Sequence, residues 1–324
     1  MQIRDVGTAS MQGDRPHQED RFLELHPGSL SSNKDIALFA VFDGHAGATV
    51  SDHLRKNVAD YIDESLSKAS AHTEETYKSA IQDALDRADA IGDQEDWKDG
   101  STLALVLIDM AQRILVEADL GDSHVVLALH TRRNKKDENK LNKLDHSLRA
   151  HHLAKGKNEW TLERLSEPHS PENPCERKRI EDAGGEIKYD TGAPRVGALA
   201  MTRAVGDLEL KLPRVNNLAA HNLSDLDGVE TGLQPGRKAS ADLVTNKAHF
   251  STQHLRGESL VFISSDGIGE AQDAELAAKT ATDFKNQGMS AKQIADELTR
   301  RATKASNSDN CTVIIISLEA PITP

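Results

Sequence analysis

The chain has 324 residues, of which 39 are basic, 52 are acidic and only 3% are aromatic, giving a formal net charge of −13. The acidic balance disfavours generic nucleic-acid binding, no apolar stretch is long enough for a membrane-spanning helix, and two cysteines can neither staple this chain nor form a zinc finger. We therefore expect a cytoplasmic or nuclear protein with no nucleic-acid or membrane partner, in which the excess of carboxylates suits the binding of divalent cations.

Short apolar runs bounded by Gly, Asp or Ser predict buried strands in the first half of the chain. These runs cover residues 36–43, 101–109, 114–122 and 123–130. Apolar residues at steps of three and four predict helices over 46–67 and 73–91. The last two strands are joined by a short Gly-Asp turn, which we interpret as an antiparallel connection and not a βαβ crossover.

Residues 131–164 differ in composition from the rest of this acidic chain. The segment from Arg132 to Arg164 has ten Lys or Arg and five Asp or Glu. We interpret it as a basic insertion that forms a solvated or partly ordered loop. The alternative is a docking site for an acidic partner or for substrates with acidic flanks.

The second half of the chain predicts the same kinds of element. Strands are expected over 259–266 and 311–318, and helices over 270–286 and 290–304, the last with Ser290 as its N-cap. Strand groups that alternate with helix pairs favour stacked sheets with helices outside. Because no long linker divides the chain, we expect one catalytic domain over residues 1–324.

Acidic residues recur at the predicted strand ends. Asp43 and Asp266 close two apolar runs, Asp309 opens a third, and Asp122 lies in a Gly-Asp-Ser turn. One such aspartate is usually a turn former, but several would repel one another unless a cation compensated their charge. Oxygen ligands of this kind select Mg²⁺ or Mn²⁺ over zinc.

Two further residues belong with these carboxylates. Arg15 stands four positions before Glu19, which is followed by Asp20, and His45 follows Asp43 by two. A guanidinium suits a phosphate and an imidazole can donate a proton. Taken singly, these would be a surface arginine and a turn histidine. Together with the carboxylates they predict metal-assisted hydrolysis of a phosphate ester.

With these residues in this order, the sequence resembles the metal-dependent serine/threonine protein phosphatases of type 2C over nearly its whole length. The resemblance is carried by motifs that occur in the family's order. They are Arg15, Glu19 and Asp20; Asp43 to His45 with Gly47; Gly100 to Thr102; Gly121 to Ser123; Glu176, Arg179, Ile180 and Ala183 to Gly185; Thr202 to Asp207; Asp266–Gly267; and Asp309–Asn310.

This resemblance implies an α+β fold, with a central β-sandwich of two antiparallel sheets flanked by pairs of α-helices. It also implies two core Mn²⁺ or Mg²⁺ ions. Asp43 would bridge both ions, and Asp266 and Asp309 would bind the first. Glu19 and the Gly44 carbonyl would bind the second, while Asp20 would hold a metal-bound water.

The resemblance further implies hydrolysis of phosphoserine and phosphothreonine in proteins by a water shared between the two ions, with no covalent intermediate. Arg15 would clamp the phosphate, and His45 would protonate the leaving alkoxide. A third, weaker metal site is expected at Asp122, Asp266 and Glu270. We expect phosphorylated proteins as substrates and a monomeric enzyme.

The chain departs from the family pattern at three places. Glu270 stands where an Asp is usual, Pro168–His169 replaces Asp-His, and His124 replaces the Arg of Gly-Asp-Ser-Arg. Two other functions stay open at this stage. One is a small-molecule metallophosphoesterase, and the other is a catalytically weak pseudophosphatase that acts as a binding module, although no core carboxylate is missing.

Overall fold

The structure is a computed structural model, and it describes residues 1–131, 159–189, 192–220, 231–268 and 274–321. The strands are β1 (Gln2–Met11), β2 (Arg21–Leu25), β3 (Ile36–Phe42), β4 (Gly44–His45), β5 (Gly100–Ser101), β6 (Leu103–Asp109), β7 (Ile114–Leu120), β8 (His124–Thr131), β9 (Glu159–Arg164), β10 (Ile187–Lys188), β11 (Arg195–Val196), β12 (Val205–Gly206), β13 (His249–His254), β14 (Gly257–Ser264) and β15 (Cys311–Ala320). The helices are α1 (Thr49–Ser67), α2 (Glu74–Glu95), α4 (Pro174–Asp182), α5 (Arg214–Ala220), α6 (Ala274–Asn286) and α7 (Ala291–Ala302), with short 3₁₀ helices η1 (Leu208–Leu210) and η3 (Asp266–Ile268).

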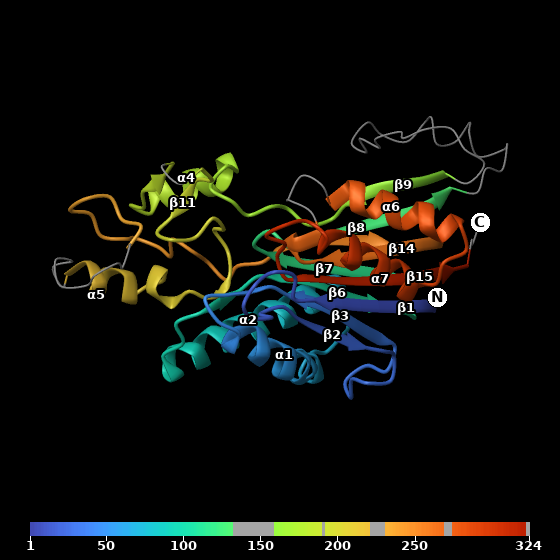
Figure 1. Cartoon of the computed structure of the whole chain (residues 1–324). Helices are drawn as coiled ribbons and strands as arrows, with labels where there is room; N and C mark the ends of the chain where they lie inside the picture. The colour runs from blue at the N-terminus through green and yellow to red at the C-terminus, as the bar shows by residue number, and fades with distance from the viewer. Residues whose placement is uncertain (132–158, 190–191, 221–230, 269–273, 322–324) are drawn as a thin grey trace, which may run out of the picture.

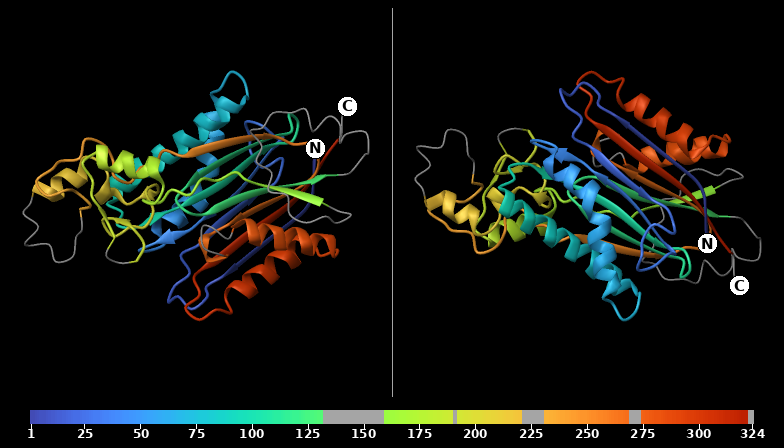
Figure 2. Two further views of the ribbon diagram at one scale, coloured as in Figure 1. Left: turned by 90° about the horizontal axis from the view of Figure 1, so that it is seen from above. Right: turned by 90° about the horizontal axis from the view of Figure 1, so that it is seen from below.

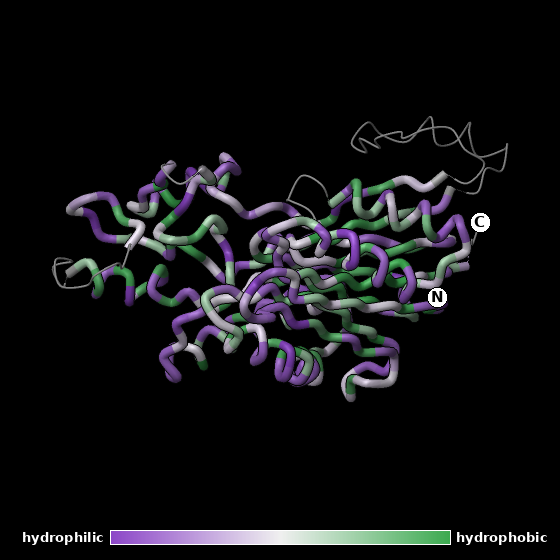
Figure 3. Tube along the Cα trace, in the orientation of Figure 1, coloured by the Kyte–Doolittle hydropathy of each residue, from purple (hydrophilic) through white to green (hydrophobic). Residues whose placement is uncertain are grey.

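Two five-stranded antiparallel sheets form the centre of the molecule. The first has the strand order β1-β15-β14-β8-β9, and the second has the order β13-β7-β6-β3-β2. Apolar residues between the sheets, such as Phe39, Val106 and Ile314, form the inner core. Figure 3 shows hydrophobic residues gathered along these strands. The predicted α+β sandwich is confirmed.

A pair of helices covers the outer face of each sheet, as Figure 1 and the two views of Figure 2 show. The helices α1 and α2 pack on the second sheet through residues such as Leu54, Ile81 and Leu85. The helices α6 and α7 pack on the first sheet through residues such as Ala281 and Ile294. Successive side chains of a strand point to opposite faces of its sheet. The strands therefore contribute to three apolar layers, one between the two sheets and one between each sheet and its helix pair.

The predicted strands and helices are present, with shifted ends. The predicted N-cap is also present, because the Ser290 hydroxyl accepts from the Gln293 N–H and the Gln293 side chain accepts from the Ser290 N–H. The predicted strand 101–109 is divided into β5 and β6, and the first residues of the predicted helix 270–286 lie outside the described residues. None of the described helices combines the length and apolar character needed to cross a bilayer.

The interpretation of 114–122 and 123–130 as a paired hairpin is wrong. The strand β7 pairs with β6 and β13, whereas β8 pairs with β14 and β9 in the other sheet. The backbone groups of both strands are therefore already satisfied by other partners. The Gly121–Asp122 turn instead carries the chain from one sheet to the other.

The basic segment contains one element that the prediction missed. Residues 132–158 lie outside the described residues, but Glu159–Arg164 forms β9 and pairs with β8. The interpretation of the whole of 131–164 as a loop is therefore wrong at its C-terminal end. An edge position explains the miss, because an edge strand can keep a charged composition with one side open to water.

A small lobe projects from one end of the sandwich and contains α4, β10, β11 and α5 (Figure 1). It comprises the described residues between 166 and 247 and has its own apolar cluster, which includes Ile180, Val196 and Leu243. The N-terminus lies at the opposite end of the sandwich. The expectation of one catalytic domain over 1–324 stays a prediction.

Candidate metal centre and active site

The predicted acidic residues meet because of the strand directions. The strands β3 and β7 flank β6 and both run antiparallel to it, so they end together. The strand β8 begins after β7 and runs antiparallel to β14, so β14 ends at the same place, and β15 begins there. Asp43, Asp122, Asp266 and Asp309 flank these four ends and therefore lie at one end of the sandwich.

One cleft of about 490 Å³ opens at this end, beside the small lobe. Eight of the predicted site residues line it, namely Arg15, Glu19, Asp43, Gly44, His45, Asp122, Asp266 and Asp309. Asp20 is buried and is not among the lining residues. Glu270, the remaining predicted ligand, lies outside the described residues.

Burial and mutual repulsion make these carboxylates hard to ionise. Burial raises the pKa of Asp43 well above its ordinary value, and the charges of Asp20 and Asp266 add to the effect. Burial also raises the pKa of Asp266 to about 7, and the charges of Asp122 and Asp309 contribute. A nearby divalent cation would stabilise the ionised forms, which is the condition expected of a metal centre.

The surroundings of Asp20 and Gly44 fit such a centre. The Ser265 and Thr312 hydroxyls donate to Asp20 Oδ2 at 2.8 and 2.7 Å, whereas the buried Asp20 Oδ1 has no hydrogen-bond partner. A Cβ at Gly44 would lie 2.7 Å from the Glu19 carbonyl oxygen, so only glycine allows these two segments to meet. Carboxylates and carbonyls of this kind suit Mg²⁺ or Mn²⁺.

Arg15 and the loop that carries Glu19 are tied to the start of β15. The Arg15 guanidinium lies 2.5 Å from the Asp309 carboxylate, and its side chain is 57% exposed. The Asn310 Oδ1 atom accepts the Glu19 N–H at 2.7 Å. The largely exposed Arg15 guanidinium thus lies beside one of the cleft carboxylates, where a phosphate could take the place of Asp309 as its partner.

His45 has a partner to which the sequence reasoning gave no role. Its Nε2 atom lies 2.8 Å from an Asp207 carboxylate oxygen, and the buried Nδ1 atom has no hydrogen-bond partner. Burial alone would lower the pKa of His45, but the charge and hydrogen bond of Asp207 outweigh it, and the pKa is raised. Asp207 belongs to the motif from Thr202 to Asp207, but nothing in the sequence indicated that it would pair with His45.

The small lobe forms one wall of the cleft, which the sequence reasoning also missed. Arg195 of β11 lines the cleft with Ala198, Leu199, Ala200 and Met201. The Arg195 guanidinium donates to the Ala198 carbonyl at 2.5 Å, which holds this loop together. The lining of the acidic cleft therefore includes a second arginine besides Arg15.

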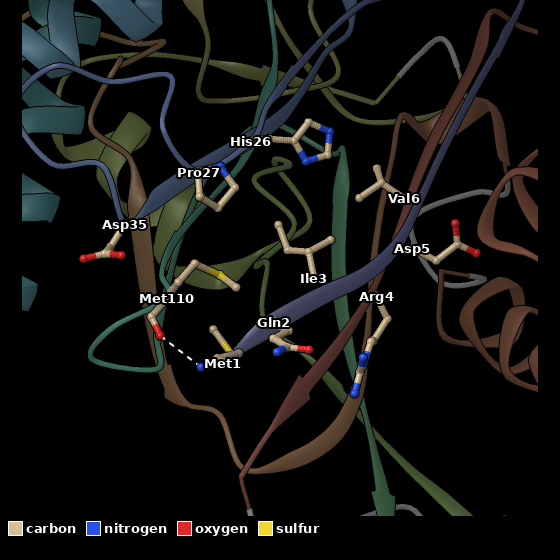
Figure 4. A pocket seen from close by; sticks show the side chains of 10 residues that line it. All are labelled: Met1, Gln2, Ile3, Arg4, Asp5, Val6, His26, Pro27, Asp35 and Met110. Carbon is tan, nitrogen blue, oxygen red and sulfur yellow. Dashed lines mark hydrogen bonds between the residues drawn. The ribbon is translucent and has the colours of Figure 1, made fainter.

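A depression of about 640 Å³ lies at the opposite end of the sandwich and lacks these features (Figure 4). Its two acidic residues, Asp5 and Asp35, lie on opposite sides of it. The Asp5 carboxylate already accepts the Ala291 N–H at 2.7 Å. The concentration of carboxylates is thus specific to the end where the strands bearing them converge.

Comparisons with known proteins find related protein phosphatases that match most of this chain. Protein phosphatase 2C homolog 2 of Schizosaccharomyces pombe is 28% identical over 315 residues, which cover 94% of this chain and 68% of that protein. Protein phosphatase fem-2 of Caenorhabditis elegans is 24% identical over 328 residues, covering 98% of this chain but only 59% of the relative's length.

Solved structures and a family model point the same way. The serine-threonine phosphatase 2C from Toxoplasma gondii has the same fold, with a TM-score of 0.64 and 19% identity over 98% of this chain and 96% of that chain. The family model described as protein phosphatase 2C matches residues 4–311. The chain therefore belongs to the protein phosphatase 2C family.

Proposed function

We propose that this chain hydrolyses phosphoserine and phosphothreonine in proteins with the help of two divalent cations. The observation that carries the proposal is the single cleft in which carboxylates from four strand ends meet a guanidinium and an imidazole. Family membership supports a phosphatase, and the complete acidic set argues against a pseudophosphatase.

The cleft residues would hold the two cations as the family motifs imply. Asp43 would bridge them, Asp266 and Asp309 would bind one, and Glu19 with the Gly44 carbonyl would bind the other. The four carboxylates bring four negative charges, which two divalent cations balance. When bound, Mn²⁺ or Mg²⁺ would supply Lewis acidity and a water acidified for attack on phosphorus.

The remaining residues would act on the phosphate and on the leaving group. Arg15 would exchange Asp309 for two equatorial phosphate oxygens, which a guanidinium binds as a fork. His45 would protonate the departing alkoxide, with its Nε2 atom paired to Asp207. Asp207 would keep the imidazole protonated and oriented. No nucleophilic side chain is needed.

Two narrower proposals concern the third cation and the substrate. Asp122 and Asp266 line the same cleft and could share a weaker third ion with Glu270. The small lobe lines one wall of the cleft, where its residues could contact the segments that flank a phosphorylated side chain, which suits a phosphoprotein better than a small molecule. We propose a monomeric enzyme that acts on phosphoproteins in the cytoplasm or nucleus.

Phosphate release from a phosphothreonine peptide tests the proposal. The wild-type chain should be active with Mn²⁺ or Mg²⁺ and inactive with chelator, and folded Asp43→Asn should lose nearly all turnover. Asp60→Asn, at an exposed position on α1, is the matched control and should keep full turnover. Near-wild-type turnover of Asp43→Asn, with its fold verified by circular dichroism, would refute the assignment.

A further inference from the structure

A second polar cluster lies outside the cleft, at the edge of the second sheet. It consists of Glu117 and Asp119 of β7 and His249 of β13, the edge strand beside β7. Among the described residues, it is the one group of three His, Cys, Asp or Glu side chains whose ligand atoms all lie within 4.8 Å of one another. Both carboxylates are fully buried, whereas His249 is 31% exposed, so the cluster is reachable from solvent.

The two carboxylates occupy positions where apolar packing would be expected. Along β7, Leu115 faces the core between the sheets, whereas Val116 and Ala118 face the helices α1 and α2. Glu117 and Asp119 therefore point between the sheets, with Leu115. Burying two like charges there is unfavourable unless something compensates them.

The contacts within the protein compensate these charges only in part. Neither oxygen of the buried Glu117 carboxylate has a hydrogen-bond partner of ordinary geometry, although the nearby Ser251 backbone N–H lowers its pKa. Burial raises the pKa of Glu117 well above its ordinary value, and the charge of Asp119 raises it further. The Arg164 guanidinium of β9 lowers that pKa, but it also donates to His124 Nδ1 at 3.1 Å. His249, whose pKa is raised by its hydrogen bond to Asp119, pairs with that carboxylate and leaves both Glu117 oxygens without a hydrogen-bond partner.

The spacing of the cluster matches the ligand shell of a small cation. The His249 Nδ1 atom lies 2.8 Å from Asp119 Oδ1 and 3.9 Å from Glu117 Oε2. Ligands at about 2.1 Å from a tetrahedral zinc ion lie about 3.4 Å apart, between these two distances. An ion could therefore enter after shifts of roughly half an ångström.

We propose that Glu117, Asp119 and His249 bind one divalent ion of the zinc class, with water as the fourth ligand. An imidazole with two carboxylates suits zinc, whereas Mg²⁺ and Ca²⁺ prefer oxygen alone. Two positive charges would balance the two carboxylates. This site is separate from the cleft, and the inference does not depend on the proposed phosphatase activity.

The cluster is connected to the turn that carries Asp122. The His169 Nδ1 atom lies 3.3 Å from Asp119 Oδ2 and accepts the Gly121 N–H at 3.2 Å. The backbone N–H of His169 in turn donates to the Gly121 carbonyl at 2.9 Å. An ion bound here would join the edge strand β13 to β7 next to this turn, so it should stabilise the fold near the cleft.

Zinc binding by the full chain, measured without substrate, tests the proposal. After chelator treatment and dialysis, Zn²⁺ is added, and bound zinc, dissociation constant and melting temperature are recorded. Asp266→Asn, which disrupts the cleft, should keep one tightly bound zinc ion and a raised melting temperature. Introducing His249→Asn or Glu117→Gln into that variant should weaken zinc binding at least about 100-fold. Mutating a residue that only hydrogen-bonds to a metal ligand already lowers metal affinity by up to about 100-fold, and losing a ligand itself should cost more.

Matched variants separate the possible outcomes. His254→Asn, on the same strand at an exposed position, should leave zinc binding unchanged. If zinc is lost from Asp266→Asn but kept when His249→Asn or Glu117→Gln is made in the wild-type chain, the ion belongs to the cleft and the proposal is wrong. The proposal is also overturned if no zinc binds and Glu117→Gln stabilises the protein. That result would mean that Glu117 and Asp119 share a proton and do not bind a metal ion.

Discussion

His45 and Asp207 are 162 residues apart in the chain. They can meet because Gly100, which lies beside both of them, has no side chain. A Cβ at Gly100 would lie 2.2 Å from Asp207 Oδ2 and 2.5 Å from His45 Nε2. Any side chain at that position would push the pair apart. The Gly-Ser-Thr motif therefore serves the imidazole–carboxylate contact as well as the start of β6.

This contact predicts a dependence on the leaving group. His45→Gln should slow hydrolysis of a phosphoserine peptide by about 10²–10⁴-fold, the usual contribution of a general acid, and should affect an aryl phosphate far less. Asp207→Asn should reproduce the pattern to a smaller extent, because the imidazole is then less firmly protonated and oriented. Turnover of both substrates by each variant checks this. Equal losses on the two substrates would assign His45 and Asp207 a structural role only.

Asp266 predicts that metal binding depends on pH. Burial raises its pKa to about 7 in the metal-free protein. The carboxyl group therefore holds a proton below that pH, and the proton competes with the cation. The apparent affinity for Mn²⁺ should rise as the pH increases from about 6 to about 8, with release of protons on binding. Calorimetry in buffers of different ionisation enthalpy measures both quantities. A constant affinity without proton release would contradict the assignment.

One buried carboxylate on α4 joins separate segments of the small lobe. The Glu176 carboxylate accepts from Arg179 at 3.0 Å, from the Thr202 hydroxyl at 2.8 Å and from Arg203 at 2.5 Å. Arg179 also donates to the carbonyls of Thr202 and Leu243. The motif from Glu176 to Gly185 therefore holds together the lobe that forms one wall of the cleft.

This network predicts a pH-dependent stability. Burial alone would raise the pKa of Glu176, but the Arg203 hydrogen bond and the charges of Arg179 and Arg203 lower it to about 2. The stabilisation is therefore complete above the ordinary value of 4.5 and is lost as the pH falls toward 2. Glu176→Gln should lower the free energy of unfolding by about 3 kcal/mol near neutral pH.

Urea unfolding of the wild type and Glu176→Gln at several pH values checks this prediction. The difference in free energy between the two should shrink as the pH falls from 4.5 toward 2. Glu181→Gln, on the exposed side of the same helix, should change little at any pH. A difference that does not vary with pH would mean that Glu176 acts through packing and not through its charge.

The strands that the sequence predicted are those whose residues are largely buried on both faces. The strands β3, β6 and β7 are fully buried and read as continuous apolar runs. The strand β13 was missed because its sequence, HFSTQH, is largely polar and only partly buried, as an edge allows. The turn at Gly121–Asp122 could not show that β7 and β8 belong to different sheets, because β13 and β14, with which they pair, are remote in the chain.

At the scale of the whole molecule, the strand directions bring the predicted site together at one end of the sandwich. The motifs identified Asp43, Asp266 and Asp309 from the sequence, because each directly flanks a recognisable strand. Asp207 and the cluster around His249 depend on contacts between segments more than 100 residues apart. Local patterns carry no information about such contacts.

The shape of the cleft predicts selectivity for protein substrates. The small lobe contributes Arg195 and Met201 to the lining of the cleft, together with Arg15, so residues that flank a phosphorylated side chain can make contact there. A phosphothreonine peptide should therefore be hydrolysed with a higher kcat/KM than a nucleotide or a sugar phosphate. A preference for the small molecules would favour a small-molecule phosphoesterase.

The most direct test of the account is phosphate release from a phosphothreonine peptide, followed as Mn²⁺ or Mg²⁺ is added to chelator-treated protein. The wild-type chain should go from no activity to full activity as the metal is added. Asp43→Asn should stay inactive at every metal concentration while remaining folded. Activity in chelator, or metal activation of Asp43→Asn equal to that of the wild type, would contradict the metal-dependent mechanism.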